Sequence, residues 1–291
     1  MYVLQELKSE LRINGELTEI VDALKVIAVT EFWSLEAHRR ERFSRFLAAF
    51  EGFFQMLDFS TIEHPFARDT SGRLSLLILT SDERFMGGLN QEVVDTALAQ
   101  AGAGAADLIV VGQQGADYLR TLGRRFERLP ETITSRRPYE AANLARQHIL
   151  AMAAERGAGR LLVVYPKPVS FLVQTVKTLP LLPCTELISL EKRELGKREA
   201  VLTPRTQVLV DSSPEALVQY LVDTWIAEKL LEVFEDSRQA ELSARAVRLE
   251  ESYQGLQDNR KKLVHSYHKT HHEALDKGMR DTFSAQVMRR R

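Results

Sequence analysis

The sequence predicts an α/β protein in which two long terminal helices form an antiparallel coiled coil and carry an inserted α/β domain between them. Two observations indicate this. Proline is absent from residues 1–64 and 215–291, and both segments repeat apolar residues at helical spacing. Between them, short apolar runs bounded by Gly, Pro or Asp alternate with helical segments, which is typical of a parallel α/β layer.

The first segment carries a single apolar stripe at spacings of three, four or their sums. The stripe consists of Leu4, Leu7, Leu11, Leu17, Ile20, Leu24 and Ile27. It predicts a helix from about residue 3 to residue 57, which is roughly 80 Å long at about 1.5 Å per residue.

The last segment begins near residue 211, where Ser212 or Ser213 can cap a helix and Pro214 suits its first turn. An apolar stripe then runs from Leu217 towards Tyr267. Periodic patterns longer than about 25 residues without internal caps are typical of coiled coils. We therefore expect residues 1–64 and 211–291 to pair as a shaft, and residues 69–210 to form the inserted domain.

Three short runs in the insert have the composition of buried parallel strands: "GRLSLLILTSD", "ADLIVVGQQG" and "GRLLVVYPKP". Helical segments over residues 91–101 and 138–156 separate them. A later pair, "CTELISLEKRE" and "TQVLVDSS", predicts further strands.

Composition excludes several classes of protein. The 39 basic and 40 acidic residues nearly cancel, so no overall field favours nucleic acid. The single cysteine, Cys184, allows no internal disulfide and suits a reducing compartment. No window has the roughly 18 apolar residues of a membrane span, and no secretion signal is evident. We expect a soluble or peripheral protein.

The loop "TSDERFMGGLN", residues 80–90, follows a predicted strand and precedes a predicted helix, as a phosphate-binding loop does. However, it has no lysine, its glycines are only the adjacent Gly87 and Gly88, and Asp82 and Glu83 would repel an anion. A turn that starts a helix is the simpler interpretation. Arg84, Phe85 and Met86 are then left to face outward and meet a partner.

Other motifs point away from chemistry. His265, His268 and His272 share one helical face, but exposed helical histidines usually only titrate, so we expect no metal. No nucleophile, base and charge stabiliser gather at the strand ends, so we expect no catalytic residues and no cofactor. Basic blocks at 38–45 and 258–269 are either solvated helix surface or contacts for acidic partner loops.

Four segments, in order, resemble the gamma subunit of F-type ATP synthases, whose fold pairs two terminal helices around a Rossmann-like domain. They are "EIVDALKVIAV", "TSDERFMGGLN", the run over residues 208–222 that enters the last helix, and "AELSARAVRLEES". The second is the most specific, since it matches the family at Ser81, Asp82, Gly87, Gly88, Leu89 and Asn90. The divergence is similar to that of the alternate bacterial F-type complexes.

The resemblance implies a non-catalytic central stalk that rotates inside a hexamer of alpha and beta subunits, with the epsilon subunit and the membrane c-ring as further partners. It places the chain peripherally on the cytoplasmic face of the bacterial inner membrane. It also implies contacts with the hexamer and with the acidic lever of a beta subunit. These contact residues are Leu24, Lys25, Ile27, Arg84, Phe85, Met86, Arg245, His271 and His272.

The near-terminal motif departs from the family pattern, because His271 and His272 stand where the family has Arg-Gln. A stand-alone coiled-coil adaptor derived from the gamma subunit is therefore an alternative. A small nucleotide-binding protein is a third class, which the acidic loop disfavours. Within that loop, Ser81, Asp82, Gly87, Gly88 and Asn90 are expected to shape the backbone.

Overall fold

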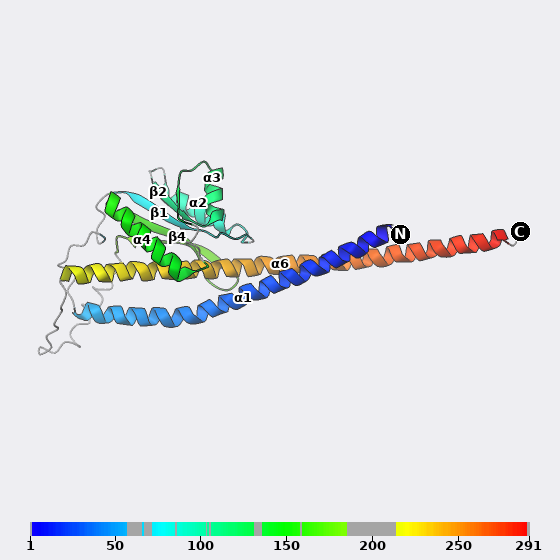
Figure 1. The fold of residues 1–291 in the computed structure, drawn as a ribbon, viewed down its shortest axis with the longest axis horizontal. Coiled ribbons are helices and arrows are strands. Elements are labelled where there is room, and N and C mark those ends of the chain that lie inside the picture. The colour runs from blue at the N-terminus through cyan, green and yellow to red at the C-terminus, as the bar shows by residue number, and fades with distance from the viewer. Residues whose placement is uncertain are drawn as a thin grey trace. The chain divides into compact units, whose positions relative to one another are not determined.

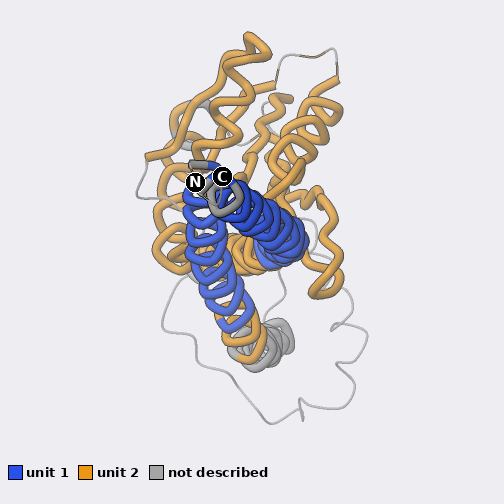
Figure 2. Tube along the Cα trace, turned by 90° about the vertical axis from the view of Figure 1, so that its right-hand side faces the viewer, with its two compact units in different colours: residues 1–30, 245–291 blue, residues 31–244 orange. Residues whose placement is uncertain are grey.

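The fold was analysed in a computed structural model, which describes residues 2–56, 66, 72–84, 86–102, 104, 106–130, 136–157, 159–184 and 214–289. Most of its helices and strands are labelled in Figure 1. The chain divides into two compact units (Figure 2). Unit 1 contains Met1–Thr30 and Arg245–Arg291, and unit 2 contains Glu31–Ala244. Both terminal helices therefore contribute residues to both units.

Two long helices open and close the chain. Helix α1 covers Tyr2–Met56, and α6 covers Pro214–Arg289. In unit 1 they pair antiparallel, because Asn14 Nδ2 donates to the Leu256 carbonyl at 3.2 Å while Lys25, further along α1, meets the earlier residue Glu250. The expected antiparallel helices are thus confirmed. None of the described helices contains an apolar window long enough to cross a bilayer.

Unit 2 contains a five-stranded sheet with the strand order β3-β2-β1-β4-β5. The strands are β1 (Leu74–Leu79), β2 (Ala106–Val111), β3 (Glu127–Arg128), β4 (Arg160–Pro168) and β5 (Gln174–Leu182). The pairs β1–β2 and β1–β4 are parallel, as expected for the three predicted strands. The two-residue strand β3, which was not predicted, pairs parallel with β2.

Strand β5 was not predicted, and it runs antiparallel to β4 at the edge of the sheet. Its run "QTVKTLPLL" includes Pro180. Proline has no backbone N–H to donate to a neighbouring strand, so it is tolerated in an edge strand. The expectation of a purely parallel layer is therefore wrong at this edge. The later predicted strand pair lies outside the described residues, apart from Cys184.

Three shorter helices complete unit 2: α2 (Leu89–Ala101), α3 (Gln113–Thr121) and α4 (Pro138–Arg156). Helices α2 and α4 match the predicted ranges within two residues. Helix α3 was missed, because its nine residues are too few to show a helical period and include Gly115.

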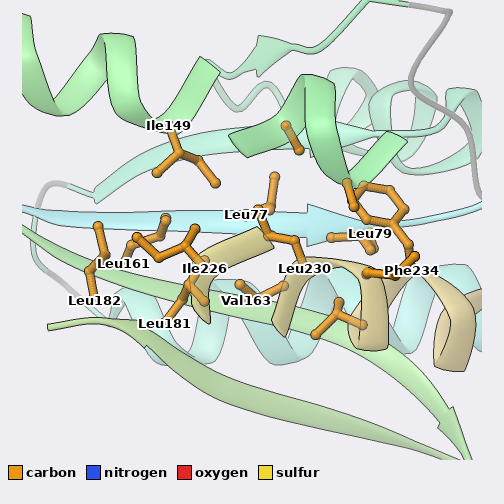
Figure 3. Packing of buried hydrophobic residues seen from close by; sticks show 14 of the residues in the cluster. Leu77, Leu79, Ile149, Leu161, Val163, Leu181, Leu182, Ile226, Leu230 and Phe234 are labelled. Carbon is orange, nitrogen blue, oxygen red and sulfur yellow. The ribbon is translucent and has the colours of Figure 1, made fainter. Parts of the chain in front are cut away.

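The sheet is covered on both faces, which explains why β1 and β4 are continuous apolar runs. One face packs against α2 and α3 through residues such as Val93, Ala97 and Leu119. The other face packs against α4 and the first part of α6. Figure 3 shows this second cluster, in which Ile149 of α4 and Ile226, Leu230 and Phe234 of α6 meet the strand residues.

Candidate functional site

The loop between β1 and α2, residues 80–90, is called the contact loop below, and side chain to backbone hydrogen bonds hold its described part. Asn90 Oδ1 accepts from the Ser81 backbone N–H at 3.0 Å, and Ser81 Oγ accepts from the Glu83 N–H at 2.9 Å. Asp82 Oδ1 accepts from the Gln113 N–H at 2.9 Å, which ties the loop to the start of α3. The carboxylate of Asp82 is thus used to order backbone.

The second half of the contact loop turns through Gly87, whose φ of +58° is a conformation that L side chains rarely adopt. Gly88 follows as the N-cap residue of α2, and its carbonyl accepts from the Glu92 N–H at 3.0 Å. The glycine pair therefore reverses the chain directly into a helix.

The three central side chains of this loop have different environments. Arg84 is exposed, and Phe85 lies outside the described residues. Met86 is buried and packs with Leu89 and Ala244 of α6. The prediction that Met86 faces outward is wrong, because its apolar thioether side chain finds cover against α6.

The base of the contact loop is a close backbone approach between β1 and the start of α3. Thr80 Oγ1 donates to the Val111 carbonyl at 2.7 Å and accepts from the Gly115 N–H at 3.0 Å. A Cβ atom at Gly112 would lie 2.0 Å from the Thr80 carbonyl oxygen. The loop is therefore seated on the sheet with no spare volume beneath it.

The contact loop faces a part of α6 that we call the buried polar segment, residues 236–243. Six of its eight residues are polar and buried: Asp236, Ser237, Arg238, Gln239, Glu241 and Ser243. Because these polar side chains are buried, each requires a hydrogen-bonding or charged partner, and the partners must surround the helix.

Partners come from three other elements of unit 2. Lys167 of β4 places Nζ 2.8 Å from Asp236 Oδ2. Ser243 Oγ donates to the carbonyl of Phe171 in the β4–β5 turn. Gln239 Nε2 donates to Glu36 of α1 at 2.8 Å. The segment is thus fixed to the sheet and to α1 at once.

Arg238 is the centre of this arrangement. Its Nη2 lies 2.8 Å from Glu31 Oε2 of α1, and its Nη1 lies 3.6 Å from Glu241 Oε2 and 4.0 Å from Glu83 Oε1. Arg136 also pairs with Glu83. Glu83, which the sequence presents as an anion-repelling residue, is in fact the contact loop's attachment to two guanidinium groups.

The predicted contact residues of unit 1 differ in exposure. Leu24 and Ile27 are 45% and 53% exposed. Lys25 instead lies between α1 and α6, with Nζ 2.8 Å from Asp22 Oδ1, 3.0 Å from Glu250 Oε2 and 4.4 Å above the Tyr253 ring. Hydrogen bonds to Asp22 and then Glu250 raise the pKa of Lys25 above its usual 10.5. Its charge is already engaged within unit 1.

The remaining predicted contacts lie along α6. Arg245 is half-buried, whereas His271 and His272 are exposed, and the His271 ring stacks on Tyr267 with centroids 6.0 Å apart. Among the described residues, no three His, Cys, Asp or Glu side chains are grouped to hold a metal ion.

The sheet topology also tests the nucleotide-binding alternative. In α/β sheets, ligands bind in the crevice beyond the carboxyl ends of strands where the connections diverge, here β1 and β4. Residues of α6 occupy that position, because Asp236 pairs with Lys167 near the carboxyl end of β4 and Arg238 faces Glu83 after β1. A cavity of about 20 Å³ lies at the opposite, amino ends of these strands and is large enough for little more than one water molecule.

These features define a class of protein: an α/β domain fastened to an antiparallel pair of long helices. Comparison with known proteins identifies the family. The family model described as ATP synthase (ATP-synt) matches residues 3–284. The chain therefore belongs to this ATP synthase family, as a gamma-type, non-catalytic central-stalk subunit.

Individual relatives agree along the chain. The ATP synthase gamma chain of Syntrophobacter fumaroxidans is 21% identical and covers 97% of both chains. That of Chlorobaculum parvum is 23% identical over 72% of this chain and 71% of its own. Among solved structures, a chain of the Euglena gracilis mitochondrial ATP synthase OSCP/F1/c-ring assembly matches with a TM-score of 0.64 at 15% identity, covering 98% of this chain and 94% of that one.

A chain of the Tetrahymena thermophila mitochondrial ATP synthase central stalk/c-ring structure matches with a TM-score of 0.53 at 17% identity. It covers 80% of this chain and 99% of that one. At these identities the structural matches establish the fold.

The sequence predicted the contact loop but not the role of Arg238. The only signal for Arg238 was a charged residue at a position of α6 that continues the apolar stripe.

Proposed function

We propose that this chain is the rotor of a proton- or sodium-translocating F-type ATP synthase, turning inside a hexamer of alpha and beta subunits. In this proposal the epsilon subunit and the membrane c-ring hold its base, peripherally on the cytoplasmic face of a bacterial inner membrane. Residues 1–64 and 211–291 act as the shaft, and residues 69–210 form the inserted domain that carries the contact loop.

The observation that carries the proposal is the uncovered apolar surface of unit 1. Large apolar side chains on α1 are about half exposed: Ile13, Leu17, Ile20, Leu24, Val26 and Ile27. On α6, Leu275, Met279 and Phe283 recur every four residues and are also exposed. A helix pair with this much uncovered apolar surface requires a surrounding partner. The hexamer of the matched ATP synthases is a partner of this kind.

Most of the proposed contact residues are exposed. Leu24 and Ile27 serve as the bearing, and Arg84 meets the acidic lever of a beta subunit. Arg245, His271 and His272 serve as further contacts along α6, with Phe85 beside Arg84. Lys25 and Met86 act indirectly, because the first braces the helix pair and the second seats the contact loop on α6.

Purification of the tagged chain from detergent-solubilised membranes tests the proposal. We expect an ATPase core with three alpha and three beta copies per copy of this chain, together with epsilon and c-ring subunits. Recovery of a single unrelated partner, and no ATPase subunits, would instead establish the stand-alone adaptor.

Cysteine cross-linking tests the bearing itself. Ile27→Cys, on an exposed position, is expected to cross-link to a beta subunit in the assembled complex, whereas Ala28→Cys, only 2% exposed, is the adjacent buried control. Equal yields from the two positions, or none from Ile27→Cys in an active complex, would contradict this assignment.

A further inference from the structure

Burial of Arg238 costs free energy, because its charged guanidinium group loses contact with water. Its side chain is only 9% exposed, and it lies among three carboxylates from three elements: Glu31 of α1, Glu83 of the contact loop and Glu241 of α6 itself. Its Nη1 lies within ion-pair distance of two of them but makes no hydrogen bond to any described residue. The desolvation of such a cation offsets much of the attraction that it gains.

Stability alone therefore does not explain this network. Buried ion pairs can often be replaced by apolar side chains without loss of stability, and their best-attested role is to specify one register among several. Apolar contacts between long helices repeat at helical spacing, so they discriminate weakly between neighbouring registers. A slip of one turn moves a side chain by about 5.4 Å along the axis.

Such a slip would break the polar contacts of the buried polar segment, among which Arg238 reaches both α1 and the contact loop. It would remove Arg238 from Glu31 and Glu83 together, leaving the buried Glu241 and the guanidinium without these neighbours. The polar contacts of this segment thus distinguish the native register from a slipped one, and those of Arg238 link α6 to both α1 and the contact loop.

We propose that Arg238 is a positioning residue that fixes the axial register of α1, α6 and the contact loop in unit 2. It acts through Glu31 and Glu83 and touches no partner itself. The functional consequence of this inference rests on the proposed function. If the contact loop of a rotor slips along the long helices, the complex hydrolyses ATP but transports fewer ions per ATP hydrolysed.

The test uses Arg238→Met together with Glu241→Gln, which removes the buried cation and the buried anion at once and keeps both volumes. The matched control is Arg137→Met with Glu140→Gln, since Arg137 and Glu140 form an ion pair of the same order and spacing, at 3.2 Å, that is exposed. Glu31→Gln, at a half-exposed position, is a second variant that folds even if the first does not.

Register is measured directly on the full chain by the distance between spin labels at Ala37→Cys on α1 and Tyr220→Cys on α6, both exposed. The native Cys184 is buried and stays unlabelled. The native chain and the control are expected to give one distance, and the Arg238 double variant a second population displaced by about 5 Å, one helical turn. Glu31→Gln is expected to give the same second population at lower occupancy.

Coupling is measured in inverted membrane vesicles that contain the assembled complex, as ATP-driven membrane potential per ATP hydrolysed, which responds to proton or sodium transport alike. With half of the molecules in the second register, coupling falls about twofold while hydrolysis persists. A single native distance and native coupling in both variants would overturn the proposal. If the unmodified chain joins no ATPase and its membranes build no potential with ATP, the proposed function is wrong, and the distance measurement alone decides the role of Arg238 in register.

Discussion

Replacement of Gly112 by alanine is expected to be the most damaging single-methyl change in unit 2. Two costs add at this position. Its φ of +93° and ψ of +143° lie in an extended region that essentially only glycine adopts, which costs another residue about 1–3 kcal/mol. The new Cβ would also lie 2.0 Å from the Thr80 carbonyl oxygen and 2.8 Å from Thr80 Oγ1.

The steric cost is worked out from what must move. Relief requires displacement of the Thr80 backbone, which donates from its N–H to the Val111 carbonyl at 2.9 Å. Overpacking of this kind costs about 1–3 kcal/mol. The two contributions sum to about 2–6 kcal/mol, a large part of the total stability of an ordinary domain.

Gly123 supplies a control that has a positive φ but no steric clash. Gly123 has a φ of +64°, but a Cβ there meets no atom within 4 Å, so Gly123→Ala carries only the backbone cost of about 1–2 kcal/mol. Thermal unfolding followed by the fluorescence of the buried Trp225, in a Trp33→Phe background, measures both variants. For a unit of this size each kcal/mol lowers Tm by about 2–4 °C. A Tm for Gly112→Ala equal to or above that of Gly123→Ala would refute the steric argument.

Three further predictions concern other parts of the chain. Burial raises the pKa of Cys184 to about 12. At pH 8 its thiolate fraction is therefore about a thousandfold below that of an ordinary thiol, and maleimide is expected to label it more slowly by the same factor. Denaturant should remove this difference. Phe234→Ala empties a fully buried site and is expected to cost about 3–5 kcal/mol in the same thermal assay. Bonds from Gln254 and then Lys25 lower the pKa of Glu250 from 4.5, while that of Lys25 is raised from 10.5. The stabilisation from Glu250 is therefore present above pH 4.5 and lost as pH falls through its lowered pKa, and that from Lys25 is lost as pH rises through its raised pKa. Lys25→Met is expected to reduce the change in helicity by circular dichroism at both ends of this pH range, and an unchanged pH profile would contradict the ion pair.

Sequence reasoning succeeded where one periodicity dominates a long segment. The terminal helices and strands β1, β2 and β4 are of this kind, because a sheet covered on both faces requires continuous apolar runs. It failed where a segment is short or where its structure depends on pairing with a distant segment. Helix α3 spans nine residues, and β5 depends on pairing with β4 despite Pro180, so neither leaves a decisive pattern in the sequence.

The contact loop shows a different limit. Its turn was predictable, because Gly87 and the polar Ser81 and Asn90 are residue types that form such turns. Which side chains it exposes was not predictable, since Met86 is buried only because Ala244, far along the chain, lies against it. Burial of a loop residue depends on tertiary contacts that local sequence does not carry.

The position of the loop also shows how this fold is used for coupling instead of chemistry. The carboxyl ends of β1 and β4 form the site where sheets of this topology commonly bind a ligand. Here Lys167 and Glu83, at those two ends, are directed at Asp236 and Arg238 of α6. The helix takes the place of a ligand in the crevice, and polar side chains that would recognise a substrate instead fasten a shaft. A fold of this kind fixes where a site can form, whereas the residues at the strand ends decide what occupies it.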